Sequence, residues 1–187
     1  MILPDEFDPD DNFDHAFGDD PDIDEEAALE AVAWQWLLLV NPGDEDAALQ
    51  QFAAFREALA DAGDTAEPTE LLRDAIDWKS GFFIADDDPH AMVDALDELA
   101  ARFNLRIDWN LDDDDESDDS ARDALDDADV ATLINTAFDR LREHHYTLWT
   151  WETGSDHHGG WITRQRDDEA LRVVAGVLGF HVRTGAG

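Results

Sequence analysis

The ten residues WETGSDHHGG, at positions 151–160, bring together the side chains of this sequence that are best suited to chemistry. Carboxylates and imidazoles bind Zn²⁺ and act as general acids and bases. The stretch offers two of each: Glu152, Asp156, His157 and His158. A metal-dependent hydrolase built on residues 152–158 is therefore one interpretation of the sequence.

The spacing of these residues favours a hairpin turn over a metal or catalytic site. Adjacent side chains of an extended segment point to opposite faces, so His157 and His158 are poorly placed to bind one ion together. Ser155–His157 cannot form a Ser-His-Asp relay, because the members of such a triad converge from separate segments. His144 and His145 lie one strand away, about 20 Å at about 3.3 Å per residue. We therefore predict a turn between two strands, with no catalytic residues, no metal and no cofactor.

The charge of the chain is strongly negative and unevenly spread. Its 48 acidic residues face 12 basic ones, for a net charge of −36, and residues 1–129 carry 41 of the acids and six of the bases. Such a chain repels polyanions, so neither nucleic acid nor an anionic membrane is expected as a partner. A basic protein is the partner that this charge favours. The alternative, that the acidic blocks only keep the chain in solution, stays open.

Three tryptophans near the hairpin offer a competing interpretation. Trp149, Trp151 and Trp161 resemble the aromatic platform on which RNA-recognition domains stack bases. Such a platform needs a basic rim, which this acidic chain does not supply. We expect these side chains to form a core between the sheet and the N-terminal half of the chain.

Nothing in the sequence predicts secretion or insertion into a membrane. There is no cysteine to form a disulfide bond. The first residues, MILPDEFDPDD, lack the basic and apolar regions of a signal peptide. The longest apolar run, Ala31–Val40, is too short to cross a bilayer. We expect a cytoplasmic protein, whose oligomeric state the sequence does not define.

Hydrophobic periodicity and capping residues predict the order of helices and strands. Six helices are expected, each beginning at an acidic cap or a proline: Asp24, Asp44, Pro68, Asp88, Asp129 and Asp167. Two short strands are expected around a turn at Lys79–Gly81, one ending at Trp78 and one starting at Phe82. Further strands are expected at 105–109, 146–151, 160–165 and 180–184.

This order predicts an α+β fold. Strand 105–109 would complete a ferredoxin-like β-α-β-β-α-β unit that packs against an N-terminal helical and α/β half. GFFI (81–84) and GWIT (160–163) match at an offset of 79, so a tandem α-β-β-α-β duplication stays open. The predicted division is an acidic, partly disordered arm, an N-terminal half, an acidic loop and a C-terminal half: 1–24, 25–110, 111–120 and 121–187.

Several stretches resemble a family of uncharacterised bacterial proteins classed only as a domain of unknown function. They are LLLVNPGDED, IDWKSGFFIADDD, YTLWTWETGSDHHGGWI and LGFHVRTG. The resemblance covers about residues 25–185 and implies no activity and no site residues. LDELAARFNLRIDW and the acidic tract after it are similar, over one helix and one strand, to the acidic protein regulators of ribonuclease E, which are also ferredoxin-like.

Two function classes follow from the sequence. The first is a non-enzymatic protein that binds a basic protein partner, as a regulator, an inhibitor or an immunity-type factor. The alternative is the metal-dependent hydrolase on residues 152–158. We expect the first, because the spacing of the polar residues favours a turn and the charge favours a basic partner.

Overall fold

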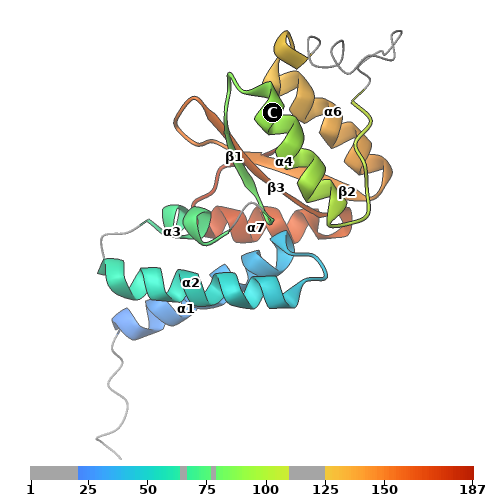
Figure 1. Cartoon of the computed structure of the whole chain (residues 1–187). Coiled ribbons are helices and arrows are strands. Elements are labelled where there is room, and N and C mark those ends of the chain that lie inside the picture. The colour runs from blue at the N-terminus through green and yellow to red at the C-terminus, as the bar shows by residue number, and fades with distance from the viewer. Residues whose placement is uncertain (1–20, 64–66, 77–78, 110–124) are drawn as a thin grey trace, which may run out of the picture.

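A four-stranded antiparallel sheet lies between two sets of helices in the computed structural model of the chain (Figure 1). The structure describes residues 21–63, 67–76, 79–109 and 125–187. The helices of these ranges are α1 (Pro21–Val40), α2 (Glu45–Ala62), α3 (Pro68–Ala75), α4 (Pro89–Ala101), α6 (Val130–Glu143) and α7 (Asp168–Leu178). The strands are β1 (Phe82–Ala85), β2 (Tyr146–Trp151), β3 (His157–Arg164) and β4 (Val182–Thr184). The predicted α+β class is confirmed.

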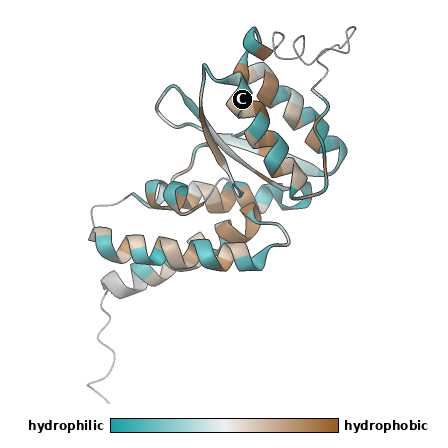
Figure 2. Ribbon diagram, viewed as in Figure 1, coloured by the Kyte–Doolittle hydropathy of each residue, from teal (hydrophilic) through white to brown (hydrophobic). Residues whose placement is uncertain are grey.

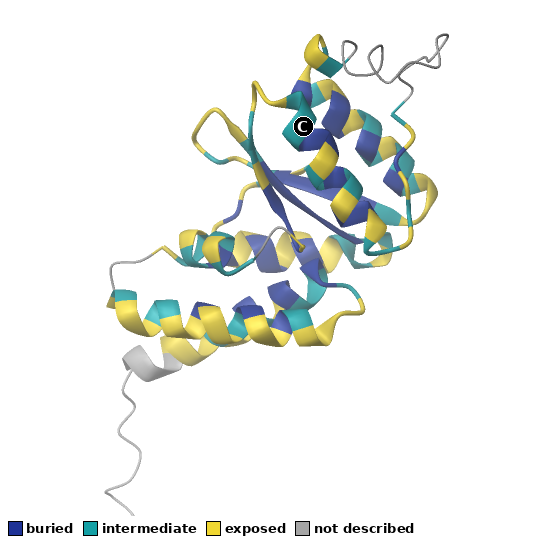
Figure 3. Cartoon of the chain, in the orientation of Figure 1, coloured by how far each residue is buried: buried dark blue, intermediate teal, exposed yellow. Residues whose placement is uncertain are grey.

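Helices cover both faces of the sheet. Helices α4 and α6 pack on one face, whereas α7 and α1 pack on the other, with α2 and α3 outside them (Figure 1). Hydrophilic and hydrophobic residues alternate around α2 and α4, which is the pattern of helices with one apolar side (Figure 2). The central strands β2 and β3 are mostly buried, while the outer side of α2 and the tip of the β2–β3 hairpin are exposed (Figure 3).

Alternation along β2 and β3 divides the core into two clusters. Leu148 faces Ile162 across the pair and packs with α4 and α6, whereas the next pair, Trp149 and Trp161, packs with α1 and α7. All four side chains are buried. Side chains of successive strand residues point to opposite faces, so each strand serves both clusters. The prediction of a tryptophan core is confirmed for Trp149 and Trp161, whereas Trp151 is half-buried and packs against the same cluster.

Local capping signals position three of the helices, whereas Asp167 precedes α7 without accepting a capping hydrogen bond. Three predicted caps accept a hydrogen bond from a backbone N–H three residues later: Asp44 from Ala47, Asp88 from Ala91, and Asp129 from Thr132. Gly179 ends α7 with a left-handed φ of 92°, as expected. Helix α1 begins at Pro21, three residues before the predicted start at Asp24.

The predicted strand at 105–109 is wrong. Leu105–Trp109 pairs with no strand, although its alternating pattern is real. Ile107 is buried against α4 and α6, and the indole N–H of Trp109 donates to both carboxylate oxygens of Asp97, at 3.2 and 3.3 Å. The apolar side chains of this segment are therefore buried by helices and not by a sheet neighbour.

The sheet order also differs from the predicted ferredoxin-like unit. The order is β1–β3–β2–β4, with β1 and β4 at the edges and every neighbouring pair antiparallel. A ferredoxin-like sheet is also antiparallel, but its first and third strands lie at the centre, whereas here the hairpin strands β2 and β3 are central. Strand β1, from the first half of the chain, takes the place next to β3. One strand is described in that half, so the tandem α-β-β-α-β order finds no support among the described residues.

A buried polar junction holds the start of β1 against the helices. Ser80 Oγ donates to Asn41 Oδ1 and accepts from Gln51 Nε2 at 2.6 Å. Arg102, at the end of α4, donates to the same Asn41 oxygen at 2.9 Å. Asn41, Gln51 and Ser80 are all buried, and hydrogen bonding offsets the cost of their burial. This junction fixes where β1 leaves the helical layer.

Some predictions concern parts of the chain that the structure does not describe. Residues 1–20 of the predicted arm, the acidic loop at 111–120 and Trp78 lie outside the described residues. The division of the chain into two halves near residue 110 stays a prediction. Among the helices of the described ranges, none is long and apolar enough to cross a membrane.

Candidate functional site

The stretch at 151–160 forms the predicted hairpin between β2 and β3. The two strands pair from Tyr146 with Arg164 to Trp151 with Gly159, so the connection is Glu152–Asp156. His157 and His158 were expected in the turn and are instead the first two residues of β3. They pair with Ala85 and Ile84 of β1. The stretch is therefore part of the sheet as well as its turn.

Two glycines shape this hairpin. A Cβ atom at Gly159 would overlap the indole ring of Trp151, and one at Gly160 would lie 2.6 Å from the ring of Phe82. Both rings lie directly over the β3 backbone, where only glycine leaves enough room. The two glycines thus bring an aromatic side chain against β3 from each neighbouring strand.

The two histidines have different partners, as their adjacent positions predict. The ring of His157 stacks on Phe83 with centroids 4.8 Å apart. His158 Nε2 lies 2.7 Å from Asp86 Oδ1 and joins the ends of β1 and β3. Each imidazole is held by a contact to the β1 segment. Their role in this arrangement is to fix β1 to the hairpin.

The two carboxylates of the hairpin are also separated. Glu152 Oε1 lies 3.5 Å from Arg183 Nη2 on β4. The backbone C=O of Asp156 accepts from the N–H of Asp86 at 3.0 Å and so extends the β1–β3 ladder. In the described part of the chain, no group of three His, Asp or Glu side chains could hold a metal ion. The structure gives the metal-dependent alternative no support.

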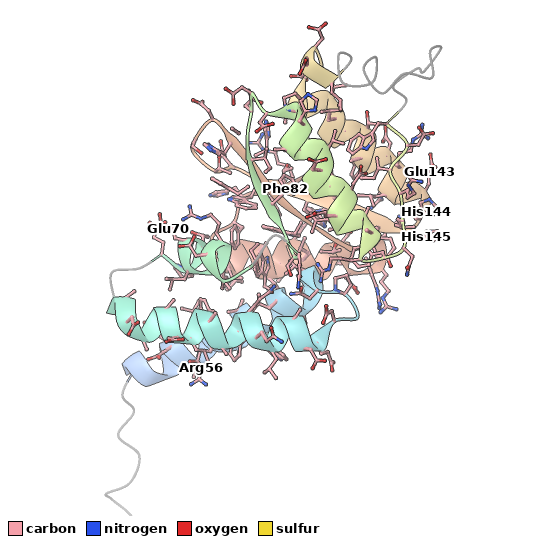
Figure 4. The ribbon with its side chains drawn as sticks, viewed as in Figure 1. Arg56, Glu70, Phe82, Glu143, His144 and His145 are labelled. Carbon is pink, nitrogen blue, oxygen red and sulfur yellow. The ribbon has the colours of Figure 1, made fainter. Side chains whose placement is uncertain are left out.

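The second histidine pair lies far from the hairpin. Figure 4 shows His144 and His145 beside Glu143 at the end of α6, where β2 begins, whereas the hairpin is at the opposite end of β2. His145 has a left-handed φ of 64°, and its C=O accepts from the N–H of Gln165 at 2.9 Å. These histidines serve the turn from α6 into β2.

An aromatic ladder runs from the core to the edge of the sheet. Trp36 contacts Trp161 edge-to-face with centroids 4.9 Å apart, and Trp161 stacks on Trp151 at 4.9 Å. Trp151 in turn lies 6.2 Å from Phe83, whose side chain is 39% exposed. Phe83 is therefore the point at which the aromatic core reaches the surface.

Strand β1 presents backbone groups at this surface. The N–H of Asp86 donates to the C=O of Asp156, which lies opposite it on the hairpin. Two and four residues earlier in the chain, Ile84 and Phe82 of β1 face His158 and Gly160 and point toward β3 in the same way. In an antiparallel pair only alternate residues exchange hydrogen bonds, so the N–H and C=O of Phe83 and the N–H of Ala85 point away from β3. No strand of the described residues pairs with that side of β1.

A hollow of about 250 Å³ lies along the outer side of β1. It is lined by β1 itself, by Trp151, by α3 and the residue after it, and by α4: Arg73, Ile76, Phe83, Ala95 and Glu98 among others. Arg73 lies over the Phe83 ring, with Cζ 5.5 Å from its centroid, and pairs with Asp74 at 3.0 Å. We call the outer side of β1 and this hollow the β1 edge.

The charged groups that line the hollow are Arg73 and Glu98, and further carboxylates follow β1 along the chain. Asp86, Asp87 and Asp88 follow β1 directly and are exposed, and Glu98 is exposed on α4. At Asp97, the residue before Glu98, burial raises the pKa of the carboxyl above its ordinary value of 3.8, and the Trp109 hydrogen bond partly offsets that rise. The β1 edge therefore combines an exposed aromatic ring, outward backbone N–H and C=O groups that no described strand pairs with, and nearby negative charge.

The sequence did not identify the β1 edge as a site. It predicted a strand beginning at Phe82 but gave no reason to single out Phe83. A signal was available in GFFI, because two adjacent phenylalanines on a strand point to opposite faces. One of them faces α4 and α6, and the other needs a second apolar surface or stays exposed.

Comparison with known proteins identifies a family but no activity. A family model described as a domain of unknown function (DUF6630) matches residues 32–185, which include the whole sheet and the β1 edge. No curated protein and no solved structure matches the chain. The likeness to regulators of ribonuclease E thus has no support from these comparisons.

Proposed function

We propose that the chain, which belongs to the DUF6630 family, acts by binding a basic protein, as a non-catalytic regulator or inhibitor of that partner. The observation that carries the proposal is the β1 edge. There, the outward N–H and C=O of Phe83 lie beside an exposed aromatic ring and an apolar hollow. Exposed strand edges and aromatic rings are features that protein partners recognise.

The charge of the chain supports a basic partner. Net charge is −36, the exposed carboxylate of Glu98 lines the hollow, and Asp87 is exposed two residues after the end of β1. Complementary charge speeds the encounter of two proteins and suppresses binding of partners of like charge. An acidic chain of this kind would therefore select a basic partner before any close contact forms.

The dimensions of the hollow at β1 suit a side chain of a protein partner better than an enclosed small substrate. Sites that enclose small molecules usually measure about 300–1,000 Å³ and hold a few converging polar groups. The hollow at β1 measures about 250 Å³ and is open to solvent along the strand. The hairpin side chains beside it contact partners within the fold, such as Asp86 with His158. This arrangement suits one anchoring side chain.

Affinity capture followed by reconstitution tests the proposal. The immobilised full chain is incubated with a lysate of its native organism, and each recovered protein is purified and mixed with the chain. We expect one basic protein to form a stoichiometric complex whose affinity falls as salt rises. Recovery only of basic proteins that form no stoichiometric complex would overturn the proposal.

A pair of charge-matched variants locates the interaction. Asp87→Asn with Glu98→Gln removes two charges at the β1 edge, whereas Glu57→Gln with Asp61→Asn removes two exposed charges from α2. We expect the first variant to weaken the complex several-fold more than the second. Equal weakening by both variants would assign the attraction to overall charge and not to this surface.

A further inference from the structure

We infer that the β1 edge takes up an extended segment of the basic partner as a fifth strand of the sheet, with alternating apolar and basic side chains. This inference rests on the proposed function and names the chemistry of the partner. Extended segments that add to a sheet edge gain affinity from backbone hydrogen bonds and specificity from pockets for alternate side chains. The β1 edge supplies both features.

The backbone part of the site is centred on Phe83. Its N–H and C=O both point outward, so an added strand can exchange two hydrogen bonds with this one residue. The N–H of Ala85 is the next outward donor, while the C=O of Ala85 accepts from the N–H of Asp88 at 3.2 Å. Strand β1 has four residues, so the added segment is short.

The two faces of the sheet carry different side chains at the β1 edge. This difference determines which side chains the added segment needs on each of its faces. On the face of Trp151, the hollow is lined by Ile76 and Phe83, with Arg73, which pairs with Asp74, over the Phe83 ring. On the face of α4 it is lined by Ala95 and by the exposed carboxylate Glu98. Successive side chains of an added strand point to these faces in turn. An apolar side chain therefore meets Ile76 and Phe83, and a basic one meets Glu98.

Charge distinguishes this occupant from a second copy of the chain. A second copy of the chain carries the same net charge of −36, so two copies repel each other as they approach. A basic segment is instead attracted, and its side chains neutralise carboxylates such as Glu98 in the hollow. The charge of the edge thus selects a partner strand of opposite sign.

Backbone methylation of a defined peptide tests strand addition directly. The probe is the capped heptapeptide Lys-Val-Lys-Val-Lys-Val-Lys, and its affinity for the full chain is measured by fluorescence anisotropy. Two further peptides carry N-methyl groups on all lysine amides or on all valine amides. Only alternate amides of an added strand bond to its neighbour, so we expect one methylated peptide to bind at least tenfold more weakly and the other within about twofold.

Variants of the chain give the matching test on the protein side. Proline is tolerated on an edge strand where its N–H would face solvent, so Ala85→Pro removes an outward donor while the β1–β3 pairing stays. We expect Ala85→Pro and Phe83→Ala each to weaken the unmodified peptide at least fivefold, with unchanged circular dichroism. The peptide series keeps the inference testable if a variant fails to fold.

Several outcomes would overturn strand addition. They are equal binding of the two methylated peptides, absence of binding by the unmodified peptide, and equal binding of a heptapeptide with Glu in place of Lys. Self-association of the wild type that Ala85→Pro abolishes would make a second copy the occupant. The proposed function fails separately, when the full chain yields no stoichiometric complex with any recovered protein.

Discussion

The indole ring of Trp151 lies directly over Gly159, its partner across the β2–β3 hairpin. A Cβ atom at residue 159 would overlap the six-membered ring of that indole. From this position Trp151 stacks on Trp161 in the core and reaches Phe83 at the β1 edge. The glycine pair of the hairpin is therefore what lets the aromatic core extend to the surface.

Substitution of Gly159 should destabilise the protein. Gly159→Ala forces the Trp151 ring away from β3, and overpacking of this kind costs about 1–3 kcal/mol of unfolding free energy. Gly176→Ala is the matched control, because its Cβ meets no atom within 4 Å on α7 and alanine favours a helix. Urea denaturation should show a loss for the first variant and none for the second. Equal stability of the two variants would contradict this account of the hairpin.

Zinc should not stabilise the protein through the hairpin. His157 stacks on Phe83 and His158 pairs with Asp86, so the two imidazoles do not converge on one ion. We expect Zn²⁺ to shift the melting temperature of the wild type no more than that of the His157→Asn, His158→Asn double variant. A true site would stabilise the wild type by about 2.7 kcal/mol at a hundred times its dissociation constant. A shift of that size confined to the wild type would restore the metal site.

Asp97 should give stability a distinct pH dependence. Burial raises the pKa of its carboxyl, so just above pH 3.8 the native chain keeps a proton that the unfolded chain has lost. Stability contributed by this group therefore falls as pH rises through the raised pKa. We expect the unfolding free energy of the wild type, relative to Asp97→Asn, to decrease from acidic to neutral pH in urea titrations. A constant difference would show that Asp97 is not desolvated.

The polar junction should be required for stability. Ser80→Ala removes the acceptor of the buried Gln51 Nε2 and one of two donors to Asn41 Oδ1, and leaving the Gln51 N–H unpaired costs about 1–3 kcal/mol. Ser155→Ala, in the exposed hairpin turn, is the control and should change stability by less than about 0.5 kcal/mol. Both values come from chemical denaturation. A Ser80 variant as stable as the control would mean that the junction does not hold β1.

The features that depend only on residues close together in the sequence were predicted correctly. Asp44, Asp88 and Asp129 cap helices through bonds to residues three positions later, and such signals need no knowledge of the fold. The β2–β3 hairpin follows likewise from turn residues between two apolar runs. Leu105–Trp109 was misjudged because alternation shows that one side is buried but not whether a strand or a helix buries it.

The candidate site depended on long-range pairing and could not be predicted. Phe82 pairs with Gly160, and nothing local to either residue specifies that register. Because β1 lies outermost in the sheet, Phe83 is exposed and its backbone points outward. The same sequence in a central strand would have neither property. The role of Phe83 comes from its place in the sheet and not from its residue type alone.

Amide hydrogen exchange at β1, followed by NMR on the full chain, tests strand addition most directly. Without a partner, the amides of Phe82 and Ile84 should exchange slowly because they bond to β3, whereas those of Phe83 and Ala85 should exchange fast. On addition of the unmodified Lys-Val heptapeptide, we expect the Phe83 and Ala85 amides to become protected as well. Unchanged exchange at both amides while the peptide is bound would contradict the account.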